Sequence, residues 1–392
     1  MPHKILVVDD EPDLELLVRQ KFRRQIREQE FEFLFARDGA EALEKVRQDA
    51  EIEVVLSDIN MPVMDGLTLL SRLNETHRDL KAVIVSAYGD MPNIRTAMNR
   101  GAFDFLTKPI DFADFETTIH KTILESLALR QGAKAREELT AIQRELGIAA
   151  QIQQSMLPKN FPPYPDRQEF SLYASMFAAK EVGGDFYDFF LIDHNRLGFV
   201  IGDVSGKGVP AAIFMAVSRT LLRATALEGL TPGECLNYVN TALSSESDTT
   251  MFVSTFYGVL HTGTGRVEYS VGGHNPPFIL KPGGVQVMEV EPGIVVGALA
   301  ESRYQNSSLQ LEPGDGMVLY TDGVTEALDA ADVLYSEERL EHLLGEVKDQ
   351  PPEDIVRRVV GDVRRHAGGV AQSDDVTVMA IRYHGQRQGK IG

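Results

Sequence analysis

The stretch "VGGDFYDFFLIDHNRLGFVIGDVSG", residues 182–206, predicts a β-hairpin that carries acids at the ends away from its turn. The turn falls at residues 193–196, between two apolar segments. If the chain folds back about residue 194, Asp185 lies opposite Asp203 within one residue of register, on one face of the hairpin. Like charges that face each other across two strands destabilise a sheet. A cation between the two carboxylates explains the pair better, and the glycines before Asp185 let backbone come close to it.

Strand and helix patterns both continue beyond residue 206. Hairpin turns are expected at "HTGTG" and "KPGG", residues 261–265 and 281–284. Strands in runs and helices in runs favour antiparallel sheets flanked by helices, an α+β architecture. The segments expected to be helical are "VPAAIFMAVSRTLLRATAL", "CLNYVNTALSS", "EERLEHLL" and "EDIVRRVVGDVRR".

Three more acids stand at strand ends in this part of the chain. Asp322 ends an apolar segment in "GMVLYTDGVTEA", and Asp374 and Asp375 precede another in "QSDDVTVMAIRY". Alone, "TDG" reads as a turn and "SDD" as a loop or a cap before a strand. Together with Asp185 and Asp203 they indicate acids that could meet at one end of a sheet sandwich.

Four segments in this order, "EVGGDFYD", "GDVSGKG", "YTDGVTEA" and "SDDVTVMAI", resemble the metal-dependent protein serine/threonine phosphatases of the bacterial sporulation and stress-response branch. The preceding "AAQIQQSMLP" resembles the lead-in common in that branch, so that the resemblance covers roughly residues 148–385. It implies two Mn²⁺ or Mg²⁺ ions, roughly 3.5 to 4 Å apart, which activate a bridging water for attack on a phosphoryl group. The implied catalytic and metal-binding residues are Asp185 and Asp203 with the Val204 carbonyl for one ion, Asp203, Asp322 and Asp374 for the other, and Asp375 as an alternate or outer ligand.

No basic residue that grips a substrate phosphate is identified by the sequence. Lys180 and Lys207 are nearest in sequence to the acids, but a lysine beside a loop is most often only solvated. His274 in "GGHNPPF" is a candidate general acid, although a place in a turn or in the core explains it better. These three residues stay unassigned.

The first 125 residues follow a different pattern. The apolar segments "KILVVDD", "FEFLFAR", "EVVLSDI", "AVIVSA" and "DFLTKP" alternate with helical patterns, which predicts βαβ units and a parallel sheet. Polar side chains stand at the carboxyl ends of four strands, where the site of such a sheet is expected: Asp9, Asp10, Asp58, Ser86 and Lys108. Carboxylates gathered in one crevice repel unless a cation such as Mg²⁺ holds them.

Residues 3–125 resemble the receiver domains of two-component response regulators. The resemblance implies that Asp58, in "LSDINMPVMDG", is the phosphoacceptor and that a sensor histidine kinase is the partner. The resulting aspartyl phosphate makes this domain an input switch. The other implied roles are Mg²⁺ binding by Asp9, Asp10, Asp58 and the Asn60 carbonyl, contacts of Ser86 and Lys108 with the phosphoryl group, a cis bond before Pro109, and Phe105 as the switch aromatic.

The segment from Leu124 to Met156 contains helix-forming residues and no strand pattern. Its small and apolar residues alternate in steps of four and three, which predicts a helical coiled-coil linker and a homodimer. A single amphipathic helix packed on its own chain is the alternative. Prolines in "LPKNFPPYP" end the helix. The positions of the expected seam are Ala128, Gly132, Ala135, Leu139, Ile142, Leu146, Ala149, Gln153 and Met156.

Bulk composition excludes several classes of protein. The 392 residues suffice for two domains and a connector, with 43% hydrophobic and 25% charged residues, as in soluble globular proteins. No signal peptide or membrane span is recognisable, and one cysteine, Cys235, agrees with the cytoplasm. The net charge of −19 opposes binding to nucleic acid or to an anionic membrane.

The sequence therefore predicts a multidomain response regulator: a flavodoxin-like receiver (1–125), a helical linker (126–158) and an α+β phosphatase (159–392). The resemblance implies that the substrate is a phosphorylated anti-sigma-factor antagonist. Two other functions are compatible with parts of this pattern. A diguanylate cyclase has "GGDEF" where this chain has "GGDFY", and it leaves Asp203, Asp322 and Asp374 without a role. The other alternative is a phosphatase-like domain that is catalytically inert and acts only by binding a partner protein.

Overall fold

The computed structural model describes residues 2–77, 80–87, 89–246 and 251–386. The chain divides into two compact units, Met1–Ile142 and Gln143–Gly392. Among the described residues no helix combines the length and the hydropathy that crossing a bilayer requires.

A parallel five-stranded sheet in the order β2-β1-β3-β4-β5 forms the centre of the first unit, as predicted. Its strands are almost wholly apolar because helices cover both faces. Helices α3, α4 and α5 pack on one face, and α1 with the start of α6 packs on the other. The strands are β1 (His3–Val8), β2 (Phe31–Ala36), β3 (Ile52–Asp58), β4 (Lys81–Ala87) and β5 (Asp104–Lys108), and the helices before α6 are α1 (Pro12–Lys21), α2 (Arg23–Arg27), α3 (Gly39–Gln48), α4 (Gly66–Thr76) and α5 (Met91–Asn99).

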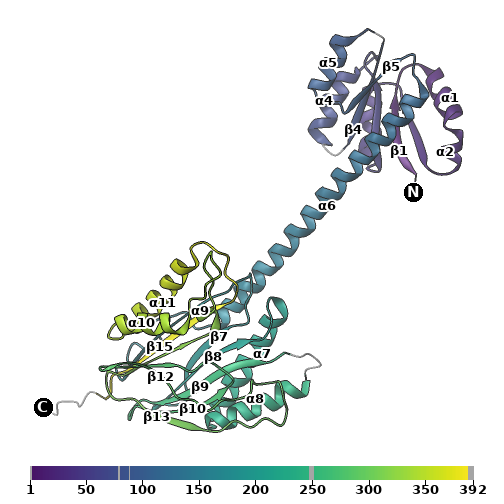
Figure 1. Ribbon diagram of the computed structural model, residues 1–392. Coiled ribbons are helices and arrows are strands. Elements are labelled where there is room, and N and C mark those ends of the chain that lie inside the picture. Colours follow the sequence, from purple (N-terminus) through teal and green to yellow (C-terminus); the bar gives the residue numbers. More distant parts are fainter. Residues whose placement is uncertain (1, 78–79, 88, 247–250, 387–392) are drawn as a thin grey trace. The chain divides into compact units, whose positions relative to one another are not determined.

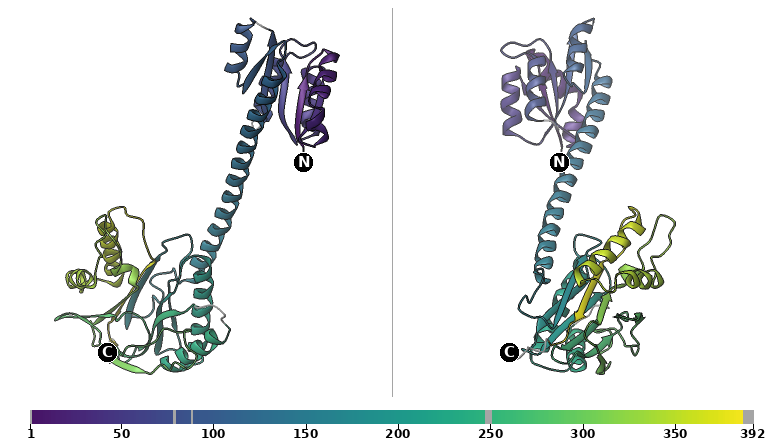
Figure 2. Two further views of the ribbon diagram at one scale, coloured as in Figure 1. Left: turned by 45° about the vertical axis from the view of Figure 1, so that its right-hand side comes forward. Right: turned by 90° about the vertical axis from the view of Figure 1, so that its left-hand side faces the viewer.

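Helix α6 runs from Phe112 to Met156 without a break (Figure 2). Near its start, Phe115 and Ile119 are buried in the core of the first unit. Residues 131–145 are all exposed. Near its end, Gln153 belongs to the second unit and is 6% exposed because it packs against Gly183 of that unit. The expected seam therefore cannot continue through Gln153: this position contacts its own chain.

Two antiparallel five-stranded sheets form the second unit, in the orders β13-β10-β9-β8-β7 and β12-β11-β14-β15-β6. Helices α7 and α8 cover the first sheet, and α10 and α11 cover the second (Figure 1). The predicted α+β architecture is confirmed. The strands are β6 (Phe170–Phe177), β7 (Phe186–Leu191), β8 (Arg196–Val204), β9 (Val253–His261), β10 (Arg266–Gly272), β11 (Phe278–Lys281), β12 (Gly284–Val287), β13 (Ser307–Gln310), β14 (Gly316–Tyr320) and β15 (Val376–Tyr383), and the helices are α7 (Val209–Leu227), α8 (Pro232–Glu246), α9 (Asp322–Thr325), α10 (Glu337–Val347) and α11 (Pro352–Ala367).

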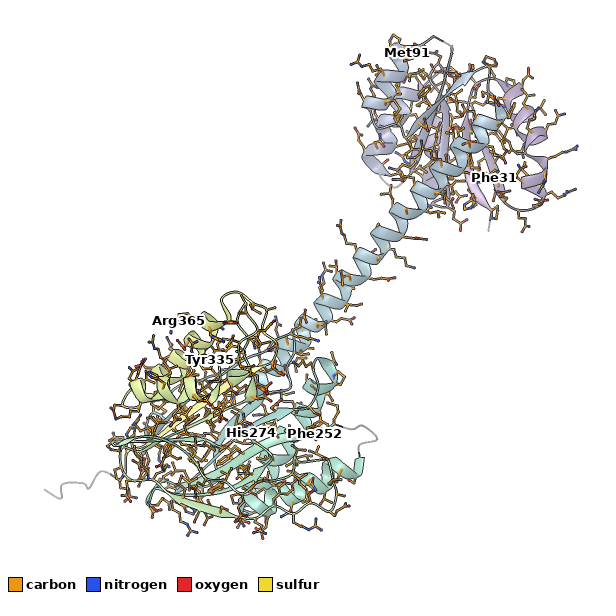
Figure 3. All side chains as sticks on the ribbon, viewed as in Figure 1. Phe31, Met91, Phe252, His274, Tyr335 and Arg365 are labelled. Carbon is orange, nitrogen blue, oxygen red and sulfur yellow. The ribbon has the colours of Figure 1, made fainter. Side chains whose placement is uncertain are left out.

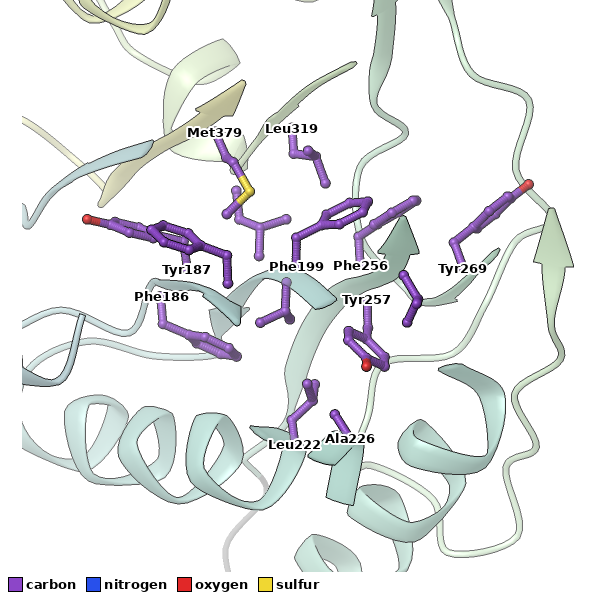
Figure 4. Packing of buried hydrophobic residues seen from close by; sticks show 14 of the residues in the cluster. Phe186, Tyr187, Phe199, Leu222, Ala226, Phe256, Tyr257, Tyr269, Leu319 and Met379 are labelled. Carbon is purple, nitrogen blue, oxygen red and sulfur yellow. The ribbon is translucent and has the colours of Figure 1, made fainter. Parts of the chain in front are cut away.

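Successive side chains along β8 and β9 point to opposite faces of the sheet and so belong to two different layers of the core (Figure 4). Phe199 and Phe256 lie on the face that meets Leu319 and Met379 of the other sheet, whereas Tyr257 lies on the face toward α7. Residues 185 and 203 share the register of Phe199, so their side chains are expected between the two sheets. The sandwich thus gives the acids of the hairpin an apolar surrounding on one side.

Candidate functional site

The hairpin places Asp185 and Asp203 opposite each other. Phe186 pairs with Gly202 and Phe189 with Phe199, so the register predicted from the sequence is confirmed. Asp185 and Asp203 are the next pair beyond Phe186 and Gly202. The charge of Asp203 acts on Asp185 and raises its pKa, after the larger effect of burial.

The two glycines before Asp185 are required by close packing. A Cβ atom on Gly183 would lie 2.2 Å from Asp375 Oδ2, and one on Gly184 would lie 2.8 Å from the Val204 carbonyl oxygen. Gly323, just after Asp322, is packed in the same way, since its Cβ would lie 1.9 Å from the Asp375 carbonyl oxygen. Any side chain at these positions would push the acid-bearing segments apart.

Asp185 is 1% exposed and is held by two hydroxyl groups. Thr321 and Thr377 donate to its Oδ2 over 2.7 and 2.6 Å. Burial raises the pKa of Asp185 well above its usual range, and the charges of Asp203 and Asp375 add to the effect. One oxygen is thus fixed by the protein, which leaves the other directed to a further partner.

Asp375 serves the loop that carries Asp185. Its Oδ1 accepts from the Ala179 N–H over 2.8 Å, and its Oδ2 accepts from the N–H groups of Gly184 and Asp185 over 2.6 and 3.2 Å. Both oxygens of this buried carboxylate are therefore engaged by backbone. This arrangement agrees better with a residue outside the metal ligands than with a direct ligand.

Asp203, Asp322 and Asp374 form an acidic cluster whose charges act on one another. Burial raises the pKa of Asp203 to about 7, with further contributions from the charges of Asp322 and Asp374. Burial likewise raises the pKa of Asp322, helped by the charges of Glu326 and Asp374. Three sequence-distant acids are thus brought together with Asp185, as the hairpin pattern and the strand ends suggested.

The donor set of this cluster fits divalent cations. Half-buried carboxylates that repel one another are costly unless cations hold them. Carboxylate and carbonyl oxygens are the ligands that Mg²⁺ and Mn²⁺ prefer. In the part of the chain that the structure describes, the one basic side chain ion-paired with an acid of the cluster is Lys207, whose Nζ lies 2.9 Å from Asp374 Oδ2.

The acids of the two units are spaced differently. In the first unit Asp9, Asp10 and Asp58 offer oxygens that all lie within 4.8 Å of one another, and among the described residues no other three acids meet this limit. Oxygens around a single Mg²⁺ lie at most about 4.2 Å apart, twice a bond of about 2.1 Å. The wider spacing in the second unit suits acids that are shared between two ions.

Lys207 and Glu326 belong to the surroundings of the acids. The sequence pointed to Lys207 without assigning it a role, and it did not point to Glu326. Lys207 also donates to the Ser373 carbonyl. Its hydrogen bond with Asp374 raises the pKa of the lysine. Glu326 follows Asp322 by one helical turn because "TDGVTE", expected as a turn, forms the short helix α9. Lys180 is exposed, as Lys207 is, but of the two lysines it is Lys207 that forms an ion pair with the cluster among the described residues.

His274 lies inside the second unit (Figure 3) and is 7% exposed. Its Nδ1 lies 2.9 Å from the Ser254 hydroxyl. Burial lowers its pKa to about 4, so the imidazole is neutral near pH 7. A neutral, buried imidazole is poorly suited to the role of general acid, and core packing accounts for it.

The receiver acids gather at the carboxyl ends of the strands, and Lys108 reaches into them. Its Nζ lies 2.6 Å from Asp58 Oδ2, 3.0 Å from Asp9 Oδ2 and 3.2 Å from Glu11 Oε1. Burial lowers the pKa of Lys108, but its hydrogen bonds with Asp58 and Asp9 outweigh this and raise the pKa. Burial also raises the pKa of Asp9. The four charges form one pocket.

The remaining receiver residues lie around this pocket at different depths. The Asn60 N–H donates to Asp58 Oδ1 over 3.3 Å. Ser86 is 1% exposed, and its hydroxyl donates to Asp90 over 3.4 Å. Phe105 is 37% exposed, and the Lys108–Pro109 bond is cis, as predicted.

The segment "MPVMDG" after Asp58 is explained by its packing. Asp65 caps helix α4 by accepting from the Thr68 N–H over 2.7 Å. A Cβ on Gly66 would lie 2.0 Å from the Asp58 carbonyl oxygen. The cap and the glycine together hold the strand end that carries Asp58.

The second aspartate of "GGDFYD" has a structural role. Asp188 is fully buried on β7 and forms ion pairs of 2.9 Å with Arg219 and with Arg223 of α7. These ion pairs fasten α7 to the hairpin. No sequence pattern pointed to them, because both arginines lie on a later helix.

We expect Asp188→Ala to lower the free energy of unfolding by about 3 kcal/mol, because Arg219 would stay buried without a partner. Urea unfolding of the full chain, followed by tyrosine fluorescence, measures the change. The chain has no tryptophan, and every tyrosine except Tyr88 belongs to the second unit. The matched control is Asp193→Ala, whose ion pair with Arg196 is exposed. It should cost less than about 1 kcal/mol, and an equal effect of both changes would contradict the prediction.

Comparisons with known proteins agree with both units. Residues 5–120 match the family model of the response regulator receiver domain, and residues 193–384 match that of stage II sporulation protein E (SpoIIE). The SiaA-PP2C domain of Pseudomonas aeruginosa superposes with a TM-score of 0.56 and 20% identity, covering 63% of this chain and 98% of that domain. This similarity shows that the second unit shares the PP2C fold.

Curated relatives match parts of the chain. Protein IcfG of Synechocystis sp. is 32% identical over 267 residues, which are 60% of this chain and 41% of that protein. Phosphoserine phosphatase RsbU of Bacillus subtilis is 29% identical over 216 residues, 55% of this chain and 63% of that protein. Phosphoserine phosphatase RsbP of the same organism is 25% identical over 236 residues, 59% of this chain and 56% of that protein. The chain therefore spans between 41% and 63% of the length of these relatives.

Proposed function

Because the chain joins a response regulator receiver domain to a phosphatase domain of the SpoIIE type, we propose that it is a regulator whose output is metal-dependent hydrolysis of phosphoserine or phosphothreonine in a protein. The observation that carries the proposal is the acidic cluster of Asp185, Asp203, Asp322 and Asp374. The burial of Asp185, Asp203 and Asp322 and the repulsion among the four acids favour bound cations, since in the part of the chain that the structure describes the one basic side chain ion-paired with these acids is Lys207. A purely structural role would not favour such a cluster.

The proposed ligands follow from the donor atoms. Asp185, Asp203 and the Val204 carbonyl would hold one ion, and Asp203, Asp322 and Asp374 would hold the other. When bound, two divalent ions supply a water of lowered pKa and neutralise phosphoryl oxygens. The protein's own part is to orient the acids: two threonine hydroxyls fix Asp185, and Asp375 fixes the loop before it.

The substrate we propose is a phosphorylated regulatory protein of the anti-sigma-factor antagonist type. The relatives RsbU and RsbP, which are named phosphoserine phosphatases, support a phosphoserine substrate. Neither nucleic acid nor a membrane is proposed as a partner, since the net charge of −19 would repel both. The proposed location is the cytoplasm.

The input we propose is phosphorylation of Asp58 by a sensor histidine kinase. Asp9, Asp10, Asp58 and the Asn60 carbonyl would hold Mg²⁺ there, with Ser86 and Lys108 on the phosphoryl group and Phe105 as the switch aromatic. Ser86 and Lys108 lie at the ends of neighbouring strands, which supports this assignment. We propose that exposed residues of α6, which include Leu139 and Ile142, pair two copies of the chain.

A manganese-dependent assay tests the proposed activity. Purified full chain is incubated with a phosphoserine protein of the antagonist type, and released phosphate is measured with and without Mn²⁺. Turnover that requires the metal supports the proposal. Absence of turnover, together with undiminished binding of the same protein by wild type and Asp203→Ala, would instead identify a binding module.

Lys207 is the basic residue best placed to attract the substrate phosphate. We expect Lys207→Met to lower kcat/KM for a phosphoprotein about tenfold, because the phosphate would lose the attraction of the lysine charge beside the acids. The matched control is Lys180→Met, which removes the same charge from an exposed position. Initial rates at saturating Mn²⁺ measure both. Equal rates for the two variants would exclude a specific role of Lys207.

A further inference from the structure

The last turn of α6 is hydrogen-bonded to the loop that leads to Asp185. Gln153 Nε2 donates to the Gly183 carbonyl over 2.6 Å, and the Gly183 N–H donates to Gln153 Oε1 over 3.0 Å. A single amide side chain thus satisfies both backbone groups of one residue. With 6% of its surface exposed, Gln153 makes these bonds out of reach of most water. Hydrogen bonds in such surroundings are worth more than on the surface.

The other side of the same loop is held by Asp375. Gly183 packs against the Asp375 carboxylate, and the next two N–H groups donate to it. The loop therefore lies between an amide from α6 and a carboxylate from the start of β15. Asp185, the acid that it positions, comes directly after the second glycine.

The glycines make this support necessary. Gly183 and Gly184 cannot carry side chains, because a Cβ atom on either would clash. Two consecutive glycines leave a chain with more backbone freedom than any other pair of residues. Such a segment keeps a single geometry only when its neighbours impose it, and Gln153 and Asp375 supply the hydrogen bonds that do so.

We propose that Gln153 is a positioning residue for metal binding: its amide holds Gly183 so that Asp185 keeps the geometry that a divalent cation requires. The inference rests on the proposed function for the identity of the site, but it concerns metal affinity and not turnover. Groups that orient the ligands of a metal commonly change its affinity 10- to 100-fold when removed. The sequence seam assigned Gln153 to a dimer contact, so this role was not expected.

The test replaces Gln153 by Met, which has a similar volume and makes neither hydrogen bond. The matched control is Gln154→Met, the same change one residue later, at an exposed position. Both are made in full chain that also carries Asp58→Ala, so that the receiver acids contribute less to the signal. Isothermal titration with Mn²⁺ gives the dissociation constant, and circular dichroism without metal gives Tm.

We expect the dissociation constant for Mn²⁺ to rise at least tenfold in Gln153→Met and less than twofold in Gln154→Met. In the activity assay, excess Mn²⁺ should restore most of kcat, because the acids themselves are intact. A role limited to folding would lower Tm and leave the affinity for Mn²⁺ unchanged. That result would overturn the inference.

A second pair of variants covers the case in which Gln153→Met does not fold. Gln153→Glu keeps an acceptor for the Gly183 N–H and loses only the donor to its carbonyl, and Gln154→Glu adds the same charge nearby. We expect the dissociation constant of Gln153→Glu to exceed that of Gln154→Glu severalfold, and equal constants would overturn the inference. If wild type binds Mn²⁺ but shows no turnover, the proposed function is refuted. The inference about Gln153 can still be tested in that case, because the dissociation constants of wild type and variants for Mn²⁺ can still be compared.

Discussion

Asp203→Asn should lose turnover at least about a thousandfold, equivalent to roughly 4 kcal/mol of transition-state stabilisation. The side chain is placed to serve both proposed ions, because it lies opposite Asp185 and feels the charges of Asp322 and Asp374. The amide keeps the shape of the carboxylate but neither its charge nor its full set of acceptors. Initial rates with a phosphoserine protein over a range of Mn²⁺ concentrations measure the loss.

Stability distinguishes this loss from unfolding. Removal of one like charge from the cluster relieves repulsion, so the metal-free Tm of Asp203→Asn should equal or exceed that of wild type. The control Asp193→Asn alters an exposed acid at the other end of the same hairpin and should keep normal rates. Rates near those of wild type for Asp203→Asn with Mn²⁺ would refute the proposed site.

Asp58→Ala should abolish the response of the phosphatase to a small phosphodonor and leave basal hydrolysis in place. Asp58 lies in the pocket with Asp9, Asp10 and Lys108, and its Oδ2 lies 2.6 Å from Lys108 Nζ, which suits the proposed phosphoacceptor. The measurement compares phosphate release before and after incubation of wild type and variant with acetyl phosphate and Mg²⁺. The sign of the response in wild type is read from the same data.

The control for this prediction is Asp104→Ala. Asp104 lies at the start of β5, at the opposite end of the strand from Lys108, and its carboxylate pairs with Lys121. The variant should therefore respond to acetyl phosphate as wild type does. Full regulation in Asp58→Ala would remove the receiver pocket from the mechanism.

The sequence predicted the features that depend on local period and on strand ends. Apolar runs predicted the parallel sheet of the first unit, and alternation about residue 194 predicted the hairpin register to within one residue. Asp185 and Asp203 could be paired because one turn joins their strands. Asp322, at the start of α9, and Asp374, before β15, are far from the hairpin in sequence. Their places at strand ends suggested that they meet the hairpin acids, and the resemblance to a family implied their roles as ligands.

Contacts between distant elements could not be predicted in the same way. The hydroxyls of Thr321 and Thr377, the arginines that hold Asp188 and the amide of Gln153 carry no period or motif of their own. The heptad seam placed Gln153 in a dimer contact because apolar spacing does not tell which surface a helix covers. Tertiary packing decided that position.

The continuity of α6 limits how such a chain can be recombined. An α-helix turns about 100° and advances about 1.5 Å with every residue. Insertion of one residue within the exposed stretch 131–145 would thus rotate everything after it by more than a quarter turn, whereas seven residues would nearly restore the phase. We expect chimeras that graft a foreign sensor ahead of the second unit to show the proposed activity in a periodic series of spacer lengths, and to lose it between them.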